Sequence, residues 1–241
     1  MKRKLLCIAA ALSTLFAAAS VQGASVQTPD GNMPLIHWAV VESADGQMGV
    51  LQQLGAKHVA PEVAKEDGTY ALYGAVDAKN PNIMRVLEFY EDDDAYRIHA
   101  VSDGFRAYDE ARRPYLKGVK ILEATGIALE QKDSGVGTSV QMDLIQVKPE
   151  CLEAYEQRLV EEIRRAAADD EHVVGLYATA EKDNPARIHT MGIFTDEEGY
   201  EAYVASPAYQ AFCRDTQDMI VMQNHIENQP VRITLSQRGV K

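Results

Sequence analysis

The chain has 241 residues, 46% of them hydrophobic, and a formal net charge of −12 at pH 7. Phosphate backbones would repel so acidic a chain, so nucleic acid is not an expected partner. The chain is long enough to bury a core without disulfide staples, and it has no Cys-x-x-Cys or His-Glu-x-x-His spacing, so we predict no metal site.

The first 23 residues have the pattern of a secretory signal peptide. Three basic residues (2–4) precede an apolar run over residues 5–19, and small residues follow at Gly23 and Ala24. The run is shorter than the roughly 20 apolar residues that a membrane-spanning helix needs. We therefore expect cleavage near Gly23 and an exported protein, periplasmic or secreted, with no membrane insertion. Cys151 and Cys213 would remain, and either free thiols or a disulfide would suit an oxidising compartment.

The chain contains an internal repeat with a constant step of 104 residues. The matching positions in the first half are Leu72-Tyr73, Asn80-Pro81, Asp92, Tyr96, Ser102 and Ala107, and each residue recurs 104 positions later. No gap is needed across this stretch, so the two halves should share one fold.

The elements expected along the chain repeat at the same step. In the first half a strand over 35–42 precedes a weak stripe of apolar residues at helical spacing, formed by Met48, Leu51, Gly55 and Val59. In the second half a strand over 140–147 precedes a stronger stripe, formed by Leu152, Tyr155, Leu159 and Ile163. Two strands follow, 173–180 and 188–194 in the second half, joined by a turn at 183–185.

Helix-start residues then appear at matching places. They are Asp92 and Ser102 in the first half, and the capping box Thr195-Asp196-Glu197-Glu198 and the pair Ser206-Pro207 in the second. We expect each half to close with a strand, about 119–129 and 231–235, and residues 130–138 to link the halves.

The predicted order is β-α-β-β-α-β, twice, which is the ferredoxin-like arrangement of an α+β protein. The two units should span residues 33–130 and 138–237. One such unit leaves a sheet face uncovered, so we expect the two sheets to face each other within the chain, as a pseudo-dimeric α+β barrel.

The repeated stretch resembles antibiotic biosynthesis monooxygenase domains. The resemblance rests on Leu176-Tyr177, Asp183-Asn184-Pro185, Phe194 to Tyr200 and Ala205 to Phe212, and on Asn80-Pro81, Glu88 to Glu91 and Ser102 to Ala107 in the first half. That family includes cofactor-independent quinol monooxygenases and haem-degrading monooxygenases. The resemblance implies a ligand pocket between sheet and helices.

Haem-degrading members carry an Asn in the first strand, a Trp on the helix before the Ser-Asp-x-Phe motif and a haem-ligating His after it. At the Trp position this chain has His99 in the first half and Tyr203 in the second, and at the ligand position it has Asp109 or Cys213. Neither half has the strand Asn. The resemblance therefore implies an enzyme without a cofactor, whose partners are a quinol- or polyphenol-type aromatic molecule and dioxygen. The alternative is a non-catalytic protein of the same fold that binds an aromatic molecule or a tetrapyrrole such as haem.

Oxygenation without a cofactor needs a base that deprotonates a phenol or hydroquinone in a dry cavity, and histidine is the natural base near neutral pH. His37 is the first candidate: strand alternation places it opposite Trp38, so if Trp38 packs between the sheets, His37 faces the helices. His99, on the helix that covers the family pocket, is the second. A histidine satisfied by a backbone carbonyl and a solvent-facing histidine are the respective alternatives.

Three aromatic side chains are the predicted substrate contacts, Trp38, Tyr73 and Tyr90, with plain core packing as the alternative for a strand tyrosine. We expect Tyr73 and Tyr90 to lie near His37 and His99. Both histidines are in the first half, so the first unit is the predicted site.

Overall fold

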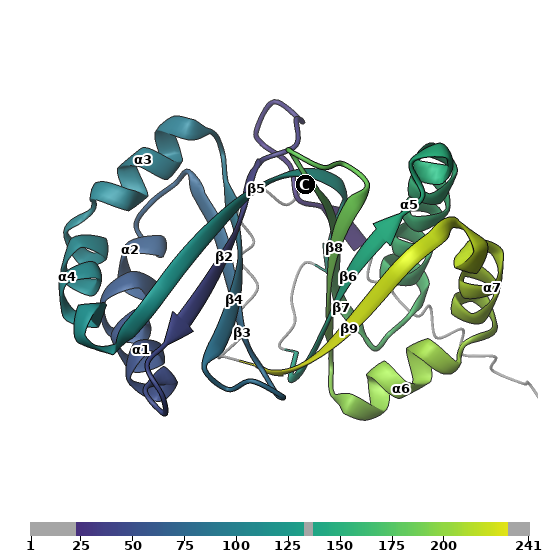
Figure 1. The fold of residues 1–241 in the computed structure, drawn as a ribbon. Helices are drawn as coiled ribbons and strands as arrows, with labels where there is room; N and C mark the ends of the chain where they lie inside the picture. Colours follow the sequence, from purple (N-terminus) through teal and green to yellow (C-terminus); the bar gives the residue numbers. More distant parts are fainter. Residues whose placement is uncertain (1–22, 133–136, 231–241) are drawn as a thin grey trace, which may run out of the picture.

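The computed structural model describes residues 23–132 and 137–230, and in it each half of the chain forms a four-stranded sheet with helices on one face (Figure 1). The predicted signal peptide and the strand predicted over 231–235 lie outside the described residues, apart from Gly23. No helix in the described ranges is long and apolar enough to cross a membrane.

The first unit follows the predicted order. After a short strand β1 (Gly23–Ser25), its elements are β2 (Leu35–Ser43), α1 (Met48–Leu54), α2 (Ala60–Val63), β3 (Thr69–Asp77), β4 (Ile83–Tyr90), α3 (Asp93–Val101), α4 (Asp103–Arg112) and β5 (Leu116–Lys132). The second unit repeats them as β6 (Ser139–Val147), α5 (Leu152–Asp169), β7 (Val173–Glu181), β8 (Arg187–Phe194), α6 (Glu197–Ala205), α7 (Pro207–Thr216) and β9 (Ile220–Pro230).

The closing strands differ from the prediction. The second unit's last described strand, β9, begins at Ile220, 104 residues after Leu116 at the start of β5, so the constant step extends to the closing strands. The sequence pattern failed because both strands begin with exposed residues that alternate poorly. The predicted linker is also too long, since β5 continues to Lys132 by pairing with β1 and β7.

The predicted helix starts at Asp92, Ser102 and Ser206 are confirmed, and at the predicted capping box Asp196, not Thr195, caps the helix. The carboxylates of Asp92 and Asp196 accept hydrogen bonds from the backbone N–H groups of Ala95 and Gly199, at 2.9 and 2.8 Å. Ser102 and Ser206 cap α4 and α7 in the same way. These caps satisfy N–H groups that have no partner within the helix, so they set where each helix begins.

The first long helix differs between the units. In the second unit, α5 is an unbroken helix that buries Tyr155, Leu159 and Ile163 against the sheet. In the first unit, the weak stripe gives the short helices α1 and α2, separated by a wider helical turn over Gly55–Val59. The buried apolar cluster beneath them is correspondingly smaller.

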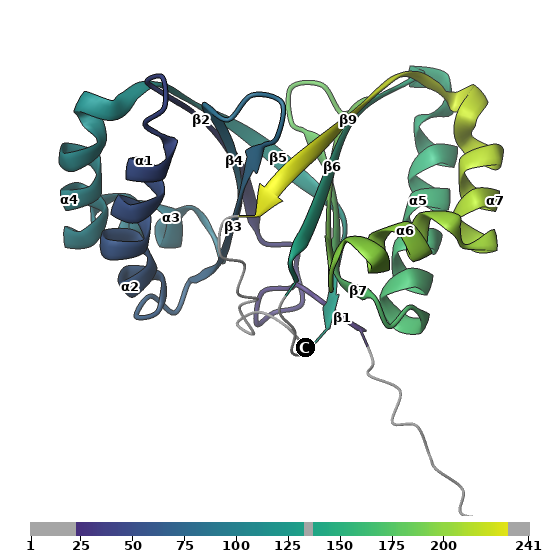
Figure 2. The ribbon, with the colours of Figure 1, turned by 90° about the horizontal axis from the view of Figure 1, so that it is seen from below.

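The two sheets face each other with their helices on the outside, as predicted (Figures 1 and 2). They also join edge to edge: β3 pairs with the end of β9, and β5 pairs with β7, so eight strands close into a barrel in the order β5-β2-β4-β3-β9-β6-β8-β7. Closure removes sheet edges that would otherwise be unpaired.

Aromatic side chains fill the space between the sheets. The rings of Tyr73 and Tyr177, the repeated tyrosines, stack with centroids 5.4 Å apart. Both hydroxyls donate to Oε1 of Gln131, at 3.2 and 2.8 Å. Trp38 of the first unit donates through its indole nitrogen to Oγ1 of Thr179 in the second, at 2.9 Å. The two units therefore share one core.

Candidate active site

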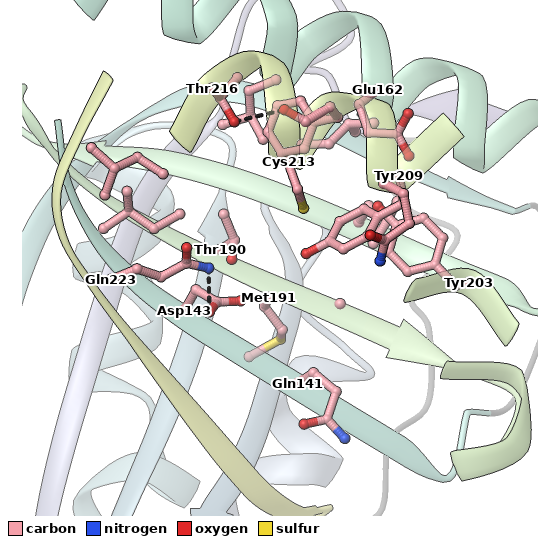
Figure 3. Close-up of a pocket in the computed structure, with 18 of the residues that line it drawn as sticks. Gln141, Asp143, Glu162, Thr190, Met191, Tyr203, Tyr209, Cys213, Thr216 and Gln223 are labelled. Atoms are coloured by element: carbon pink, nitrogen blue, oxygen red, sulfur yellow. Dashed lines mark hydrogen bonds between the residues drawn. The ribbon is translucent and has the colours of Figure 1, made fainter. Parts of the chain in front are cut away.

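A cavity of about 400 Å³ lies in the second unit, between its sheet and its helices (Figure 3). Side chains from β6, β8 and β9 form the floor, and α5, α6 and α7 form the roof. Its apolar wall is largely aromatic: Tyr155, Phe194, Tyr200, Tyr203, Tyr209 and Phe212. A concave, mostly apolar site with a few polar groups is the usual form of a small-molecule site.

The first unit carries different side chains at the matching strand positions. In the second unit Gln141 of β6 lies opposite Gly192 of β8; in the first, His37 lies opposite Glu88. Gly192 adds no side chain to this layer, and the ring of Phe194 packs over it, so that a Cβ on Gly192 would lie only 2.6 Å from that ring. Glu88 instead carries a carboxylate that accepts a hydrogen bond from Tyr90 at 3.1 Å.

Asp143 is the acidic group on the floor of the cavity. Its Oδ1 atom accepts a hydrogen bond from Nε2 of Gln223 at 2.9 Å and lies 3.3 Å from Nδ1 of His225. Both contacts are to the same oxygen, so among the described residues Oδ2 remains available to a ligand. On the far side of its ring, Nε2 of His225 lies 3.5 Å from the hydroxyl of Tyr200. These neighbours orient the carboxylate toward the cavity.

The tyrosines of the cavity are uncharged near neutral pH. Burial raises the pKa of Tyr200 to about 12, with Asp143 as the next cause. Burial also raises the pKa values of Tyr155, Tyr203 and Tyr209 above the ordinary value. Their hydroxyls are therefore neutral groups that can hydrogen-bond a ligand.

Glu162 and Cys213 lie on the helical side of the cavity. The Glu162 carboxylate is buried and pairs with Arg165 at 2.7 Å. Burial raises the pKa of the Cys213 thiol, so the protonated form is favoured. Cys151 and Cys213 are both free thiols in the structure.

The five predicted site residues do not line one cavity. His37, Tyr90 and His99 do meet, between the sheet and helices of the first unit: the Tyr90 ring centroid lies 6.0 Å from that of His37 and 5.7 Å from that of His99. Trp38 and Tyr73, however, lie on the opposite face of the sheet, in the core between the sheets. Strand alternation separates the two groups, so the predicted grouping of Tyr73 with the histidines is wrong.

Both predicted histidines are buried. His37 is 5% exposed, its Nδ1 atom has no hydrogen-bond partner within the described residues, and burial lowers its pKa. Nδ1 of His99 lies 2.7 Å from Oε2 of Glu66. Asp109, at the family's haem-ligand position, is bound by Arg112 and Arg113. The described residues contain no cluster of three or more His, Cys, Asp or Glu side chains suited to a metal ion.

The sequence did not predict the second-unit cavity, because the candidate base was expected to be a histidine and the two best candidates lie in the first unit. The available signal was the alternation in residues 139–147, which puts Gln141 and Asp143 on the same face as the core residue Ile145. The partners of Asp143, Gln223 and His225, were hidden because β9 was predicted too late in the chain.

Two tandem ferredoxin-like units, closed into one barrel with a cavity under the helices, define the class of protein. The family model for antibiotic biosynthesis monooxygenase matches the chain twice, over residues 38–111 and 139–215. The chain belongs to this family, and membership supports a general monooxygenase role.

Solved structures share the fold. A candidate monooxygenase from Lactobacillus acidophilus NCFM has a TM-score of 0.79 at 14% identity, covering 87% of this chain and 99% of that one. Another from Fusobacterium nucleatum subsp. nucleatum ATCC 25586 has a TM-score of 0.78 at 16% identity, covering 84% and 94%. A comparison with curated proteins found no match.

Proposed function

We propose that the protein is a monooxygenase that oxidises a quinol- or polyphenol-type aromatic molecule in the second-unit cavity, without flavin, metal or haem. The observation that carries the proposal is Asp143, an oriented carboxylate on the floor of a cavity whose walls are aromatic. Aromatic walls suit a flat ring, and the carboxylate supplies a base next to it.

The chemistry balances with dioxygen as the only oxidant. Asp143 removes the proton of a substrate hydroxyl, and the resulting phenolate passes one electron to dioxygen. The superoxide and semiquinone radicals then combine, forming a C–O bond at the ring carbon beside the phenolate. The peroxide is protonated, its O–O bond breaks, and the ring carbon loses its hydrogen as a proton. One oxygen remains as a carbonyl and the other leaves as water, so hydroquinone and dioxygen give hydroxyquinone and water.

The cavity walls support this sequence in two ways. The neutral tyrosines exclude water from the radical pair and can hydrogen-bond the substrate oxygens. Asp143 keeps one oxygen bound by Gln223 while the other stays available to accept and return protons.

The test is oxygen uptake by the purified protein across a panel of hydroquinones, with ¹⁸O₂ to follow the oxygen atoms. We expect one ¹⁸O atom in the product, and about 10² to 10⁴ times slower turnover for Asp143→Asn, as for loss of a general base. Asp183→Asn, in the exposed turn after β7, is the matched control and should keep full turnover.

Two outcomes would redirect the proposal. If Asp143→Asn keeps full turnover while His37→Ala or His99→Ala loses it, the first-unit assignment predicted from the sequence is correct. Binding of hydroquinones with no oxygen uptake would instead identify a non-catalytic binding protein.

We also propose that the protein acts outside the cytoplasm after cleavage near Gly23. The basic residues 2–4 and the apolar run behind them support this. Amino-terminal sequencing of the protein from the exported fraction tests it, and a retained Met1 would contradict it.

A further inference from the structure

Gln141 places an unpartnered hydrogen-bond acceptor at the cavity. Its side chain lines the cavity floor and is 8% exposed. Its amide nitrogen donates to Oγ of Ser139 at 3.1 Å and to Oε2 of Glu197 at 3.3 Å. Its amide oxygen is buried with no hydrogen-bond partner among the described residues. A buried acceptor without a partner is costly, so it marks a place where a ligand donor is missing.

The hydrogen-bonding partners of the Gln141 side chain determine where its amide nitrogen and its amide oxygen lie. A carboxylate such as Glu197 only accepts hydrogen bonds, so the amide nitrogen must face it. Ser139 donates to the same carboxylate oxygen at 2.8 Å, which leaves its own oxygen to accept from Gln141. The amide oxygen therefore faces away from Glu197, and Figure 3 shows it on the side toward Asp143.

We infer that Gln141 determines substrate specificity by accepting a hydrogen bond from a second hydroxyl, so that the site prefers an aromatic ring with two free hydroxyls over a ring with only one. The inference rests on the proposed function, since Asp143 receives the first hydroxyl. Gln141 and Asp143 are two residues apart on one strand face, where the rise is about 3.3 Å per residue. Two hydroxyls of one ring can therefore reach the Gln141 and Asp143 acceptors together.

The charges of the site agree with this class of ligand. Asp143 on the floor and Glu162 on the helical side are acidic, and Arg165 is paired with Glu162. A carboxylated ring would be repelled by this arrangement, whereas a neutral diol offers the O–H donors that both acceptors need.

The test measures binding without oxygen, so that it does not depend on turnover. Calorimetry would compare hydroquinone and 4-methoxyphenol on the wild-type protein and on Gln141→Met, a variant of similar length that removes the acceptor. We expect the wild type to bind hydroquinone about tenfold more tightly than 4-methoxyphenol, because the ether leaves the Gln141 oxygen unpaired. In Gln141→Met this ratio should fall close to one.

Gln146→Met is the control, because Gln146 is on the same strand but outside the cavity lining. It should keep the wild-type ratio, and circular dichroism would confirm that both variants fold. The inference is overturned if Gln141→Met keeps the tenfold preference, or if the wild type binds 4-methoxyphenol as tightly as hydroquinone. The binding test and the oxygen-uptake assay can give different outcomes. If the protein prefers the diol but shows no turnover, the oxygenase proposal is contradicted and the role of Gln141 is not.

Discussion

Replacing Glu88 with Gln should stabilise the protein at alkaline pH and have little effect at acid pH. Glu88 stands in the first unit at the position that Gly192 holds in the second. Burial raises the pKa of the Glu88 carboxyl to about 7, against the smaller opposing effects of a hydrogen bond from Tyr90 and the charge of Arg112. Gln can still accept the hydrogen bond from Tyr90, but it has no charge to bury.

The direction of this pH effect follows from proton binding to the Glu88 carboxyl. Below pH 4.5 the carboxyl is protonated in the folded and the unfolded chain alike. Between pH 4.5 and about 7 the folded protein keeps a proton that the unfolded chain has released, so the free energy of unfolding falls as the pH rises. Above about pH 7 both states are ionised and the loss is complete. A pKa raised from 4.5 to about 7 corresponds to roughly 3 kcal/mol at most. Glu88 keeps some contact with solvent, so we expect about 1–2 kcal/mol.

Urea unfolding at a series of pH values between roughly 4.5 and 8.5 measures this effect, with the fluorescence of the single tryptophan, Trp38, as the signal. The difference in unfolding free energy between Glu88→Gln and wild type should grow by about 1–2 kcal/mol across that range. Glu110→Gln, at an exposed position of α4, is the control for removing one charge. A difference that stays constant with pH would refute the argument that a buried carboxyl in the first unit destabilises the folded state.

Two further predictions concern the cavity and the shared core. Gly192→Glu introduces the residue of the first unit and should abolish hydroquinone binding in calorimetry, because even a Cβ at this position would lie 2.6 Å from the Phe194 ring. The control is Gly118→Ala, where a Cβ meets nothing within 4 Å, and this variant should bind hydroquinone normally. Trp38→Phe should lower the unfolding free energy by about 1–3 kcal/mol in urea titrations, since it removes the hydrogen bond to Thr179 and leaves unfilled space between the sheets. An unchanged unfolding midpoint would show that this contact does not hold the units together.

Local chemistry accounts for the parts of the fold that could be predicted. Asp196 and Ser206 bind backbone N–H groups a few residues away, so their effect is visible in a short stretch of sequence. Because residues repeat at a constant step of 104, the same order of elements was predicted for the first half. β9 was misplaced because its first residues are largely exposed, and an exposed strand lacks the apolar alternation that such predictions use.

The candidate site depended on contacts between distant residues. Gln223 binds Asp143 from 80 positions away in the chain, and no local pattern reports such a pair. The sequence pattern also did not show that the cavity lies in the second unit, because the predicted elements and caps are the same in both halves. Side-chain volume is one difference between them: Glu88 stands in the first unit where Gly192 stands in the second.

The sequence by itself determined the element order, the duplication and the family, because these follow from periodicity, capping and repeated residues that act over short distances. Only the tertiary structure decided that the sheets close into one barrel, that Trp38 and Tyr73 lie in the shared core, and that the cavity is in the second unit. The physical reason is that strand pairing and the filling of space are settled between residues brought together by the whole fold.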